Sequence, residues 1–142
     1  MESAMKYRFI EKAGPAEANG IITIYKTQGW WDRGASRAGL NRLIRGSHCF
    51  LVAERDGSII GMGRAISDRA GDAYIQDVAV LKSERGTGAG KGIVSALVRR
   101  LKRDGITWIA LIAQDNSGAF YGKLGFKTLK NASPMLSKGS YV

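Results

Sequence analysis

The sequence predicts an α/β (α+β) fold, with a mixed, mostly antiparallel sheet of about six or seven strands flanked by about four helices. Two observations carry this prediction. Residues 74–81 are mostly β-branched and apolar, a glycine-dense turn follows at 82–90, and apolar residues then recur at helical spacing up to residue 104. Residues 49–66 form two strand-like runs around a short turn, which is typical of an antiparallel hairpin. A hairpin that leads into a strand, a loop and a helix gives a mixed sheet with helices packed on it.

One strand and two helices are predicted before the hairpin. Residues 7–10 alternate between polar and apolar side chains and indicate a first strand at the edge of the sheet. Pro15 favours the first turn of a helix, which is expected to run to about Lys26. Ser36 is a typical N-cap residue for a second helix that ends at about Arg45.

The hairpin is predicted from strands at 49–53 and 59–66, which flank a turn at residues 55–58. Gly61 and Gly63 interrupt the second of these strands. Glycine inside a strand indicates a bulge or a close approach of another part of the chain. We therefore expect one of these two features at this point of the sheet.

The later elements follow the hairpin in order. Residues 74–81 are expected to form a central, largely buried strand, and residues 107–113 a strand after the long helix. Residues 127–129 can form a further strand, and residues 134–142 a weak last strand or a tail. No repeats, low-complexity tracts or linkers interrupt the chain, so residues 1–142 are expected to form one domain.

The composition gives expectations about the cellular location of the protein and about metal binding. No apolar run approaches the ~20 residues of a membrane span, and the start of the sequence lacks the apolar core of a signal peptide. A single cysteine, Cys49, is typical of a protein of the reducing cytoplasm. With one cysteine and one histidine, no zinc site of the usual type is expected, and no metal ligands are predicted.

The formal net charge of +10 is the strongest compositional signal. It fits a nucleic-acid partner, an anionic co-substrate or a basic surface without a specific partner. The basic residues are dispersed, with their densest cluster at residues 99–103, and no interleaving of aromatic and basic residues indicates an RNA-binding sheet. The sequence therefore does not favour a nucleic-acid partner.

The turn between the strand at 74–81 and the following helix is a predicted phosphate-binding loop. The first N–H groups of a helix have no partner within the helix, and the helix dipole adds partial positive charge there. Glycines let a phosphate approach these donors, and Arg85 and Lys91 add full charges on either side. The spacing excludes the P-loop, and it excludes the dinucleotide fingerprint because Lys91 stands where that fingerprint needs its third glycine.

The remaining pattern is R-x-x-G-x-G over residues 85–90, after a strand that ends in VAV at 78–80. It resembles the acyl-CoA loop of the GNAT superfamily of N-acetyltransferases. The resemblance implies acetyl-CoA as the co-substrate. The residues that it implies as contacts of this co-substrate are Val78, Ala79, Val80, Arg85, Gly86, Thr87, Gly88, Ala89, Gly90 and Lys91.

A second motif stands at residues 120–126 and reads FYGKLGF. It resembles the GNAT helix that ends in F-Y-x-K-x-G-F and places its tyrosine beside the sulfur of CoA. The family often has Asn seven residues before this tyrosine, whereas this chain has Gln114 there and Asn116 two residues later. Either residue can be the one that reaches the co-substrate.

The two motifs together imply direct transfer of an acetyl group from acetyl-CoA to a primary amine. Tyr121 is the expected general acid, because a tyrosine keeps its proton at neutral pH and can give it to the leaving thiolate. Asp77 is the best candidate for the base that deprotonates the amine, with Asp72 and Glu84 weaker. An unperturbed Asp is a poor base for an amine, so the alternative that Asp77 anchors local structure stays open.

The acceptor pocket is expected from residues 25–36 and from the hairpin. Gly29 breaks the first helix, and the loop after it carries the predicted substrate-binding residues Trp30 and Trp31. This pair weakly resembles the Gly-Trp loop of small bacterial aralkylamine-type acetyltransferases, which implies a small or aromatic amine. Simple burial of the two rings in the core is the alternative.

Other functions stay open at this point. The acceptor can be a protein N-terminus or a lysine instead of a small molecule. A non-catalytic acyl-CoA sensor and a basic nucleic-acid-binding adaptor are the alternatives outside enzymology. The sequence also leaves a homodimer open.

Overall fold

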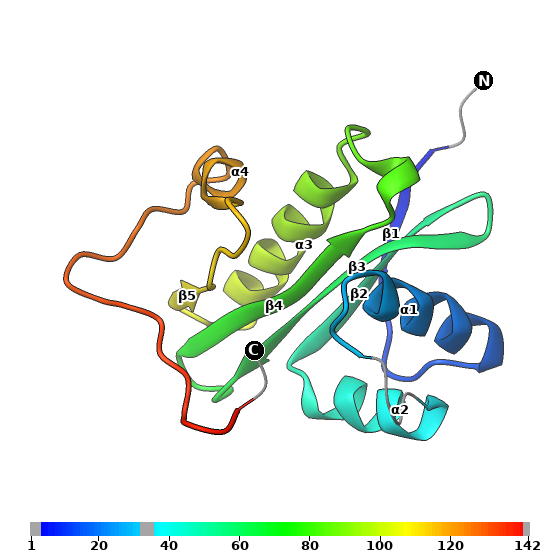
Figure 1. Ribbon diagram of the computed structural model, residues 1–142, viewed down its shortest axis with the longest axis horizontal. Helices are drawn as coiled ribbons and strands as arrows, with labels where there is room; N and C mark the ends of the chain where they lie inside the picture. Colours follow the sequence, from blue (N-terminus) through cyan, green and yellow to red (C-terminus); the bar gives the residue numbers. More distant parts are fainter. Residues whose placement is uncertain (1–3, 32–35, 141–142) are drawn as a thin grey trace. The chain divides into compact units, whose positions relative to one another are not determined.

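A five-stranded sheet in the order β1-β2-β3-β4-β5 forms the centre of the first of two compact units, Met1–Leu111 (Figure 1). The second unit is Ile112–Val142. The computed structural model describes residues 4–31 and 36–140.

The elements of the first unit follow the predicted order closely. The strands are β1 (Lys6–Phe9), β2 (Cys49–Arg55), β3 (Ser58–Ser67), β4 (Asp72–Val80) and β5 (Trp108–Ala110). The helices are α1 (Pro15–Thr27), α2 (Arg37–Gly46), the short 3-10 helix η1 (Lys82–Glu84) and α3 (Ala89–Arg103). The first four strands pair antiparallel, and β5 pairs parallel to β4, so the predicted mixed and mostly antiparallel sheet is confirmed.

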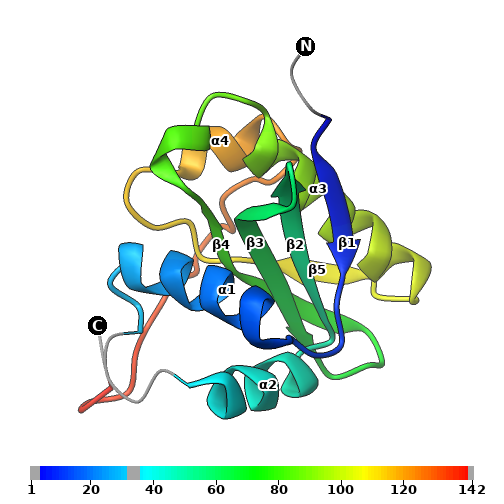
Figure 2. The same cartoon turned by 90° about the vertical axis from the view of Figure 1, so that its right-hand side faces the viewer.

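The two faces of the sheet are covered by different helices. Figures 1 and 2 show α3 on one face and α1 with α2 on the other. Side chains of α1, such as Ile21 and Ile24, form one core with Val52, Met62 and other residues of the strands. Alternate residues of one strand point to opposite faces, so each strand contributes to both layers.

Local sequence signals explain where these elements begin and turn. Pro15 is the first residue of α1, and the Ser36 side chain caps α2 by accepting a hydrogen bond from the N–H of Gly39. The hairpin turns at Asp56 and Gly57, which both have positive φ, as a two-residue turn between twisted strands requires. These predictions are confirmed.

The strand count differs from the prediction. The described part of the chain has five strands, and neither residues 127–129 nor residues 134–140 form one. The second unit contains α4 (Gly118–Gly122), while the rest of its described residues are turns and irregular chain. A strand needs a partner for its backbone groups, and in this segment Pro134 lacks an N–H while Asn131 and Gly139 have positive φ.

The burial of β4 also differs from the prediction. Ala73 and Ile75 are buried, whereas Asp72, Tyr74 and Gln76 are exposed, so the first half of the strand alternates. The apolar character of residues 74–81 therefore does not mean that both faces of this strand are buried.

Gly61 and Gly63 show both features that were expected of them. A Cβ on Gly61 would lie 2.9 Å from Cδ1 of Ile93, and one on Gly63 would lie 2.7 Å from Cγ2 of the same residue. The pairing of β3 with β4 is also irregular at this point. Glycine here lets α3 pack directly on the backbone of β3.

We expect Gly63→Ala to lower the free energy of unfolding by about 1–3 kcal/mol, because the new methyl group overpacks the contact with Ile93 and Leu97. Chemical denaturation measures this loss. Gly46→Ala is the matched control, since a Cβ at that position meets nothing within 4 Å. Equal stability of the two variants would show that α3 can shift away from β3 without a loss of folding free energy.

Candidate active site

The loop between β4 and α3 has the backbone geometry of an anion-binding loop. Gly86 and Gly88 have φ of +81° and +89°, which other residues adopt only with strain. Gly88 is the N-cap of α3, so the chain reverses there and enters the helix without a side chain in the way. The N–H groups of the first turn of α3 have no acceptor within the helix and are available to a ligand.

The side chains of this loop point to solvent, while its end is anchored. Arg85, Thr87 and Lys91 are exposed, whereas Ala89 is 1% exposed and belongs to the core. The hydroxyl of Thr87 donates a hydrogen bond of 2.6 Å to the carbonyl oxygen of Glu84, which stabilises the loop. An exposed loop with two cations at a helix N-terminus is suited to a diphosphate.

The second half of β4 has an open edge. The parallel pairing with β5 ends at Tyr74 and Ala110, so β5 does not cover the later residues of β4 in this unit. The N–H of Leu81 donates to the carbonyl oxygen of Ile60 in β3 at 2.8 Å. Because backbone groups alternate along a strand, the N–H groups of Val78 and Val80 point to the open edge, and that of Ala79 points to β3.

Asp77 lies at the start of this open segment. Its Oδ2 accepts a hydrogen bond of 2.8 Å from the hydroxyl of Tyr25 and one of 2.6 Å from Nε of Arg64. Two donors, one from α1 and one from β3, thus meet at the same carboxylate oxygen and tie the Asp77 side chain to both elements. The role of Asp77 as a base stays a prediction, and these contacts favour the alternative that it anchors local structure.

The weaker candidates for a base are not better placed. Glu84 forms an ion pair with Arg55, with Nε and Oε1 3.3 Å apart, and Asp72 is exposed at the start of β4. His48 lies near the other end of α3, where Nε2 is 2.9 Å from Oδ2 of Asp104. The described residues contain no group of three His, Cys, Asp or Glu side chains that could hold a metal ion.

Three aromatic rings gather at the end of α1. Tyr25 is 3% exposed, and the rings of Trp30 and Trp31 contact it edge-on, with centroids 6.3 and 5.2 Å away. Trp30 remains 43% exposed, whereas Trp31 is partly buried and packs against the core. The two tryptophans therefore differ, and Trp30 is the one with a surface free to meet a ligand. The predicted acceptor residues 32–35 lie outside the described residues.

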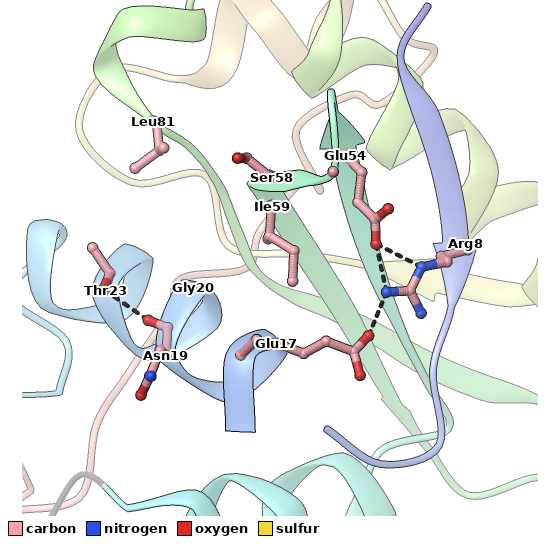
Figure 3. Close-up of a pocket in the computed structure, with 11 residues that line it drawn as sticks. Arg8, Glu17, Asn19, Gly20, Thr23, Glu54, Ser58, Ile59 and Leu81 are labelled. Atoms are coloured by element: carbon pink, nitrogen blue, oxygen red, sulfur yellow. Dashed lines mark hydrogen bonds and ion pairs between the residues drawn. The ribbon is translucent and has the colours of Figure 1, made fainter. Parts of the chain in front are cut away.

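A cavity of about 530 Å³ lies between α1 and the β2–β3 hairpin (Figure 3). Asn19, Thr23 and Ser58 contribute polar groups, and Ile59 and Leu81 contribute apolar surface. At one side the guanidinium of Arg8 bridges Glu17 and Glu54, as Figure 3 shows. The hairpin lines this cavity, while the helical side comes from residues 16–23 and neither tryptophan lines it. The acceptor pocket at residues 25–36 and the hairpin stays a prediction.

The second motif forms a small aromatic cluster within the second unit. Tyr121 lies in α4, and its ring contacts those of Phe120 and Phe126 edge-on, with centroids 4.9 and 5.9 Å away. Burial raises the pKa of the Tyr121 hydroxyl above its usual value, so this group is protonated at neutral pH. Gln114 and Asn116 are both exposed, which does not decide between them.

Sequence reasoning missed two residues of this region, Tyr25 and Arg64. Tyr25 stands among the apolar residues of α1, and no local pattern indicates a partner for its hydroxyl. Arg64 stands between Gly63 and Ala65 in an otherwise apolar strand, and such a position could have indicated a buried charge that needs a partner.

A glycine loop at a helix N-terminus, beside a strand with an open edge, gives an α/β protein with a site suited to a ligand that carries phosphate groups. The chain belongs to the acetyltransferase (GNAT) family, whose model matches residues 17–126. Members of this family use acetyl-CoA as the co-substrate. This finding confirms the resemblance that the two motifs indicated.

Three known proteins show how close the likeness is. The chain is 33% identical over 138 residues to "Probable acetyltransferase TAP2" of Glycine max. This match covers 87% of this chain and 54% of that protein. It is 40% identical over 88 residues to GCN5-related N-acetyltransferase 2, chloroplastic, of Arabidopsis thaliana, covering 62% of this chain and 33% of that protein. The chain thus spans about half the length, or less, of these curated relatives.

The structure of glucosamine-6-phosphate N-acetyltransferase from Arabidopsis thaliana superposes with a TM-score of 0.74, 22% identity and 95% and 97% coverage of the two chains. At this identity the likeness concerns the fold. No helix among the described residues has the length and apolar character that crossing a membrane requires.

Proposed function

We propose that the protein is an N-acetyltransferase that moves an acetyl group from acetyl-CoA to a primary amine. The observation that carries this proposal is the β4–loop–α3 unit, in which Gly88 opens the N-terminus of α3 beside the open edge of β4. The diphosphate of the donor would bind the loop at residues 85–91. The acyl thioester would then lie along the edge that begins after Tyr74.

The chemistry needs a stabilised carbonyl oxygen and a proton for the leaving group. The nitrogen of the neutral amine attacks the carbonyl carbon of the thioester, the C–S bond breaks, and the thiolate takes a proton. The nitrogen loses one proton to water as the amide forms, and solvent reprotonates the group that served as the acid. The N–H groups of Val78 and Val80 are the donors that can stabilise the negative charge on the oxygen. We assign the proton to the hydroxyl of Tyr121, which the family motif matches.

The acceptor that we propose is a small or aromatic amine. Support comes from the exposed ring of Trp30 beside Tyr25 and Trp31, because an aromatic surface binds both apolar groups and cations. A protein N-terminus or lysine is the second candidate acceptor. An outcome of the test below separates the two.

The test has two arms on the intact chain. Calorimetric titration with acetyl-CoA measures binding, and a free-thiol assay over a panel of small amines, aromatic amines and peptides measures transfer. We expect binding and release of thiol with a subset of the small amines. Binding without thiol release from any acceptor would leave an acyl-CoA sensor, and no binding would contradict the proposal. Activity on peptides alone would assign a protein acceptor.

We expect Trp30→Ala and Trp31→Ala to act differently. Loss of the exposed Trp30 ring removes acceptor contacts, so KM for the amine should rise while KM for acetyl-CoA stays as it is. Loss of the Trp31 ring removes packing against the core, so the melting temperature should fall. Steady-state kinetics and thermal unfolding of both variants measure the two effects. If both variants lost equal stability and kept the wild-type kinetics, the two rings would serve only to pack the core.

Three further expectations concern the number of domains, the cellular location and the oligomeric state. The matched region spans both compact units, which supports one acetyltransferase domain over residues 1–142. The cytoplasmic location stays a prediction, because the Arabidopsis thaliana relative is chloroplastic. The homodimer also stays open.

A further inference from the structure

The pairing of β3 with β4 contains a bulge at Asp77. Arg64 pairs with Gln76 and Met62 pairs with Ala79, so the single residue Gly63 lies opposite both Asp77 and Val78. One extra residue on one strand defines a β-bulge, which bends the strand and redirects the groups that follow it. Here those groups belong to the open edge of β4.

The bulge has an energetic cost that other contacts must offset. Asp77 has φ of +56°, in the left-handed region, where a residue other than glycine is strained by about 1–2 kcal/mol. Such a conformation persists only when the surrounding structure holds it. The contacts of the Asp77 side chain are therefore informative about how the bulge is kept.

Tyr25 and Arg64 supply these contacts from α1 and β3. Both donate to Oδ2 of Asp77, at 2.8 and 2.6 Å, and Nη2 of Arg64 also donates to Oε1 of Gln76 at 3.3 Å. Burial, together with the nearby Asp77 carboxylate, raises the pKa of Tyr25 well above its usual value, so its hydroxyl remains a donor. The Trp30 and Trp31 rings contact the Tyr25 ring in edge-to-face geometry, which limits its movement.

We propose that Tyr25 and Arg64 are positioning residues that hold Asp77 in its left-handed conformation and thereby aim the N–H groups of Val78 and Val80 at the acyl donor. The role in catalysis rests on the proposed function, whereas the role in holding the bulge does not. Asp77 then acts as the anchor of the bulge. No proton from the amine passes through it.

A set of variants separates an anchor from a base. Asn tolerates the left-handed conformation, and its carbonyl oxygen can accept the bonds from Tyr25 and Arg64, whereas Ala can do neither. For an anchor we expect Asp77→Ala to lower kcat by about 10²-fold, the cost of a misplacement of about 1 Å, and Asp77→Asn to lower it by less than about tenfold. For a base, both variants would lose about 10²–10⁴-fold. Equal losses would overturn the proposal.

Tyr25→Phe tests the positioning role directly. It keeps the ring and removes one donor to Asp77, so kcat should fall by about three- to tenfold, the effect of a single net hydrogen bond. The dissociation constant of acetyl-CoA should not change, because the phosphate-binding loop is untouched. Tyr74→Phe is the matched control, since Tyr74 is an exposed residue of β4, the strand that contains Asp77. Equal kinetics of the two variants would remove Tyr25 from this role.

Hydrogen exchange gives a readout that does not depend on turnover. In the free protein we expect Tyr25→Phe and Asp77→Ala to speed amide exchange in the peptide that covers residues 74–81, with no change in the peptide that covers β2. Asp77→Asn and Tyr74→Phe should leave both peptides close to the wild type. Unchanged amide exchange at residues 74–81 in Asp77→Ala would contradict the proposal that the Asp77 side chain holds the bulge. If the wild type transferred acetyl to no amine, the proposed function would fail while the exchange result still decided the role of the bulge.

Discussion

We expect Gly88→Glu and Gly90→Glu each to remove tight binding of acetyl-CoA. Each substitution places a carboxylate at the N-terminus of α3, where the proposed site receives the negatively charged diphosphate. A like-charge contact of this kind costs several kcal/mol, so we expect the dissociation constant to rise by more than about 100-fold. Isothermal titration calorimetry with acetyl-CoA measures the loss.

The two glycines differ in the strain that a substitution brings. Gly88 has φ of +89°, so any side chain there strains the backbone, whereas Gly90 lies in the first turn of α3 without a positive φ. Gly105, just beyond the C-terminus of α3, has φ of +87° and open space around it, as Gly88 has. Gly105→Glu therefore reproduces the strain and the charge away from the loop. Wild-type affinity in Gly88→Glu or Gly90→Glu, or equal loss in Gly105→Glu, would contradict the phosphate-binding loop.

We expect Tyr121→Phe to lower kcat by about 10²-fold, the lower end of the range for general acid–base catalysis, because water partly replaces the lost acid. The change removes one oxygen and keeps the ring, so the contacts with Phe120 and Phe126 persist. The melting temperature and the affinity for acetyl-CoA should therefore remain near those of the wild type. Steady-state kinetics with the acceptor found in the amine panel measure the effect.

An acyl donor with a more acidic thiol distinguishes an acid from a residue that only positions the donor. A better leaving group needs the proton less, so the loss in Tyr121→Phe should shrink with such a donor. A loss of the same size for both donors would leave Tyr121 a positioning role. An unchanged kcat with both donors would remove Tyr121 from the mechanism.

The sequence alone determined the elements that depend on local signals. Pro15, Ser36 and the hairpin turn act within a few residues, so the bounds of α1, α2, β2 and β3 could be read from the chain. The same holds for the loop at residues 85–90, where glycines and the following helix are adjacent in sequence. Family membership followed from two such local motifs.

Only the tertiary structure decided how residues distant in sequence meet. Tyr25 and Asp77 are 52 residues apart, and no local pattern indicated that one would donate to the other. The exposure of half of β4, the cavity lined from residues 16–23, and the missing strand at 127–129 likewise depend on which elements pack together. The physical reason is the same in each case, because strand pairing and burial are properties of partners, and a segment of sequence does not contain its partner.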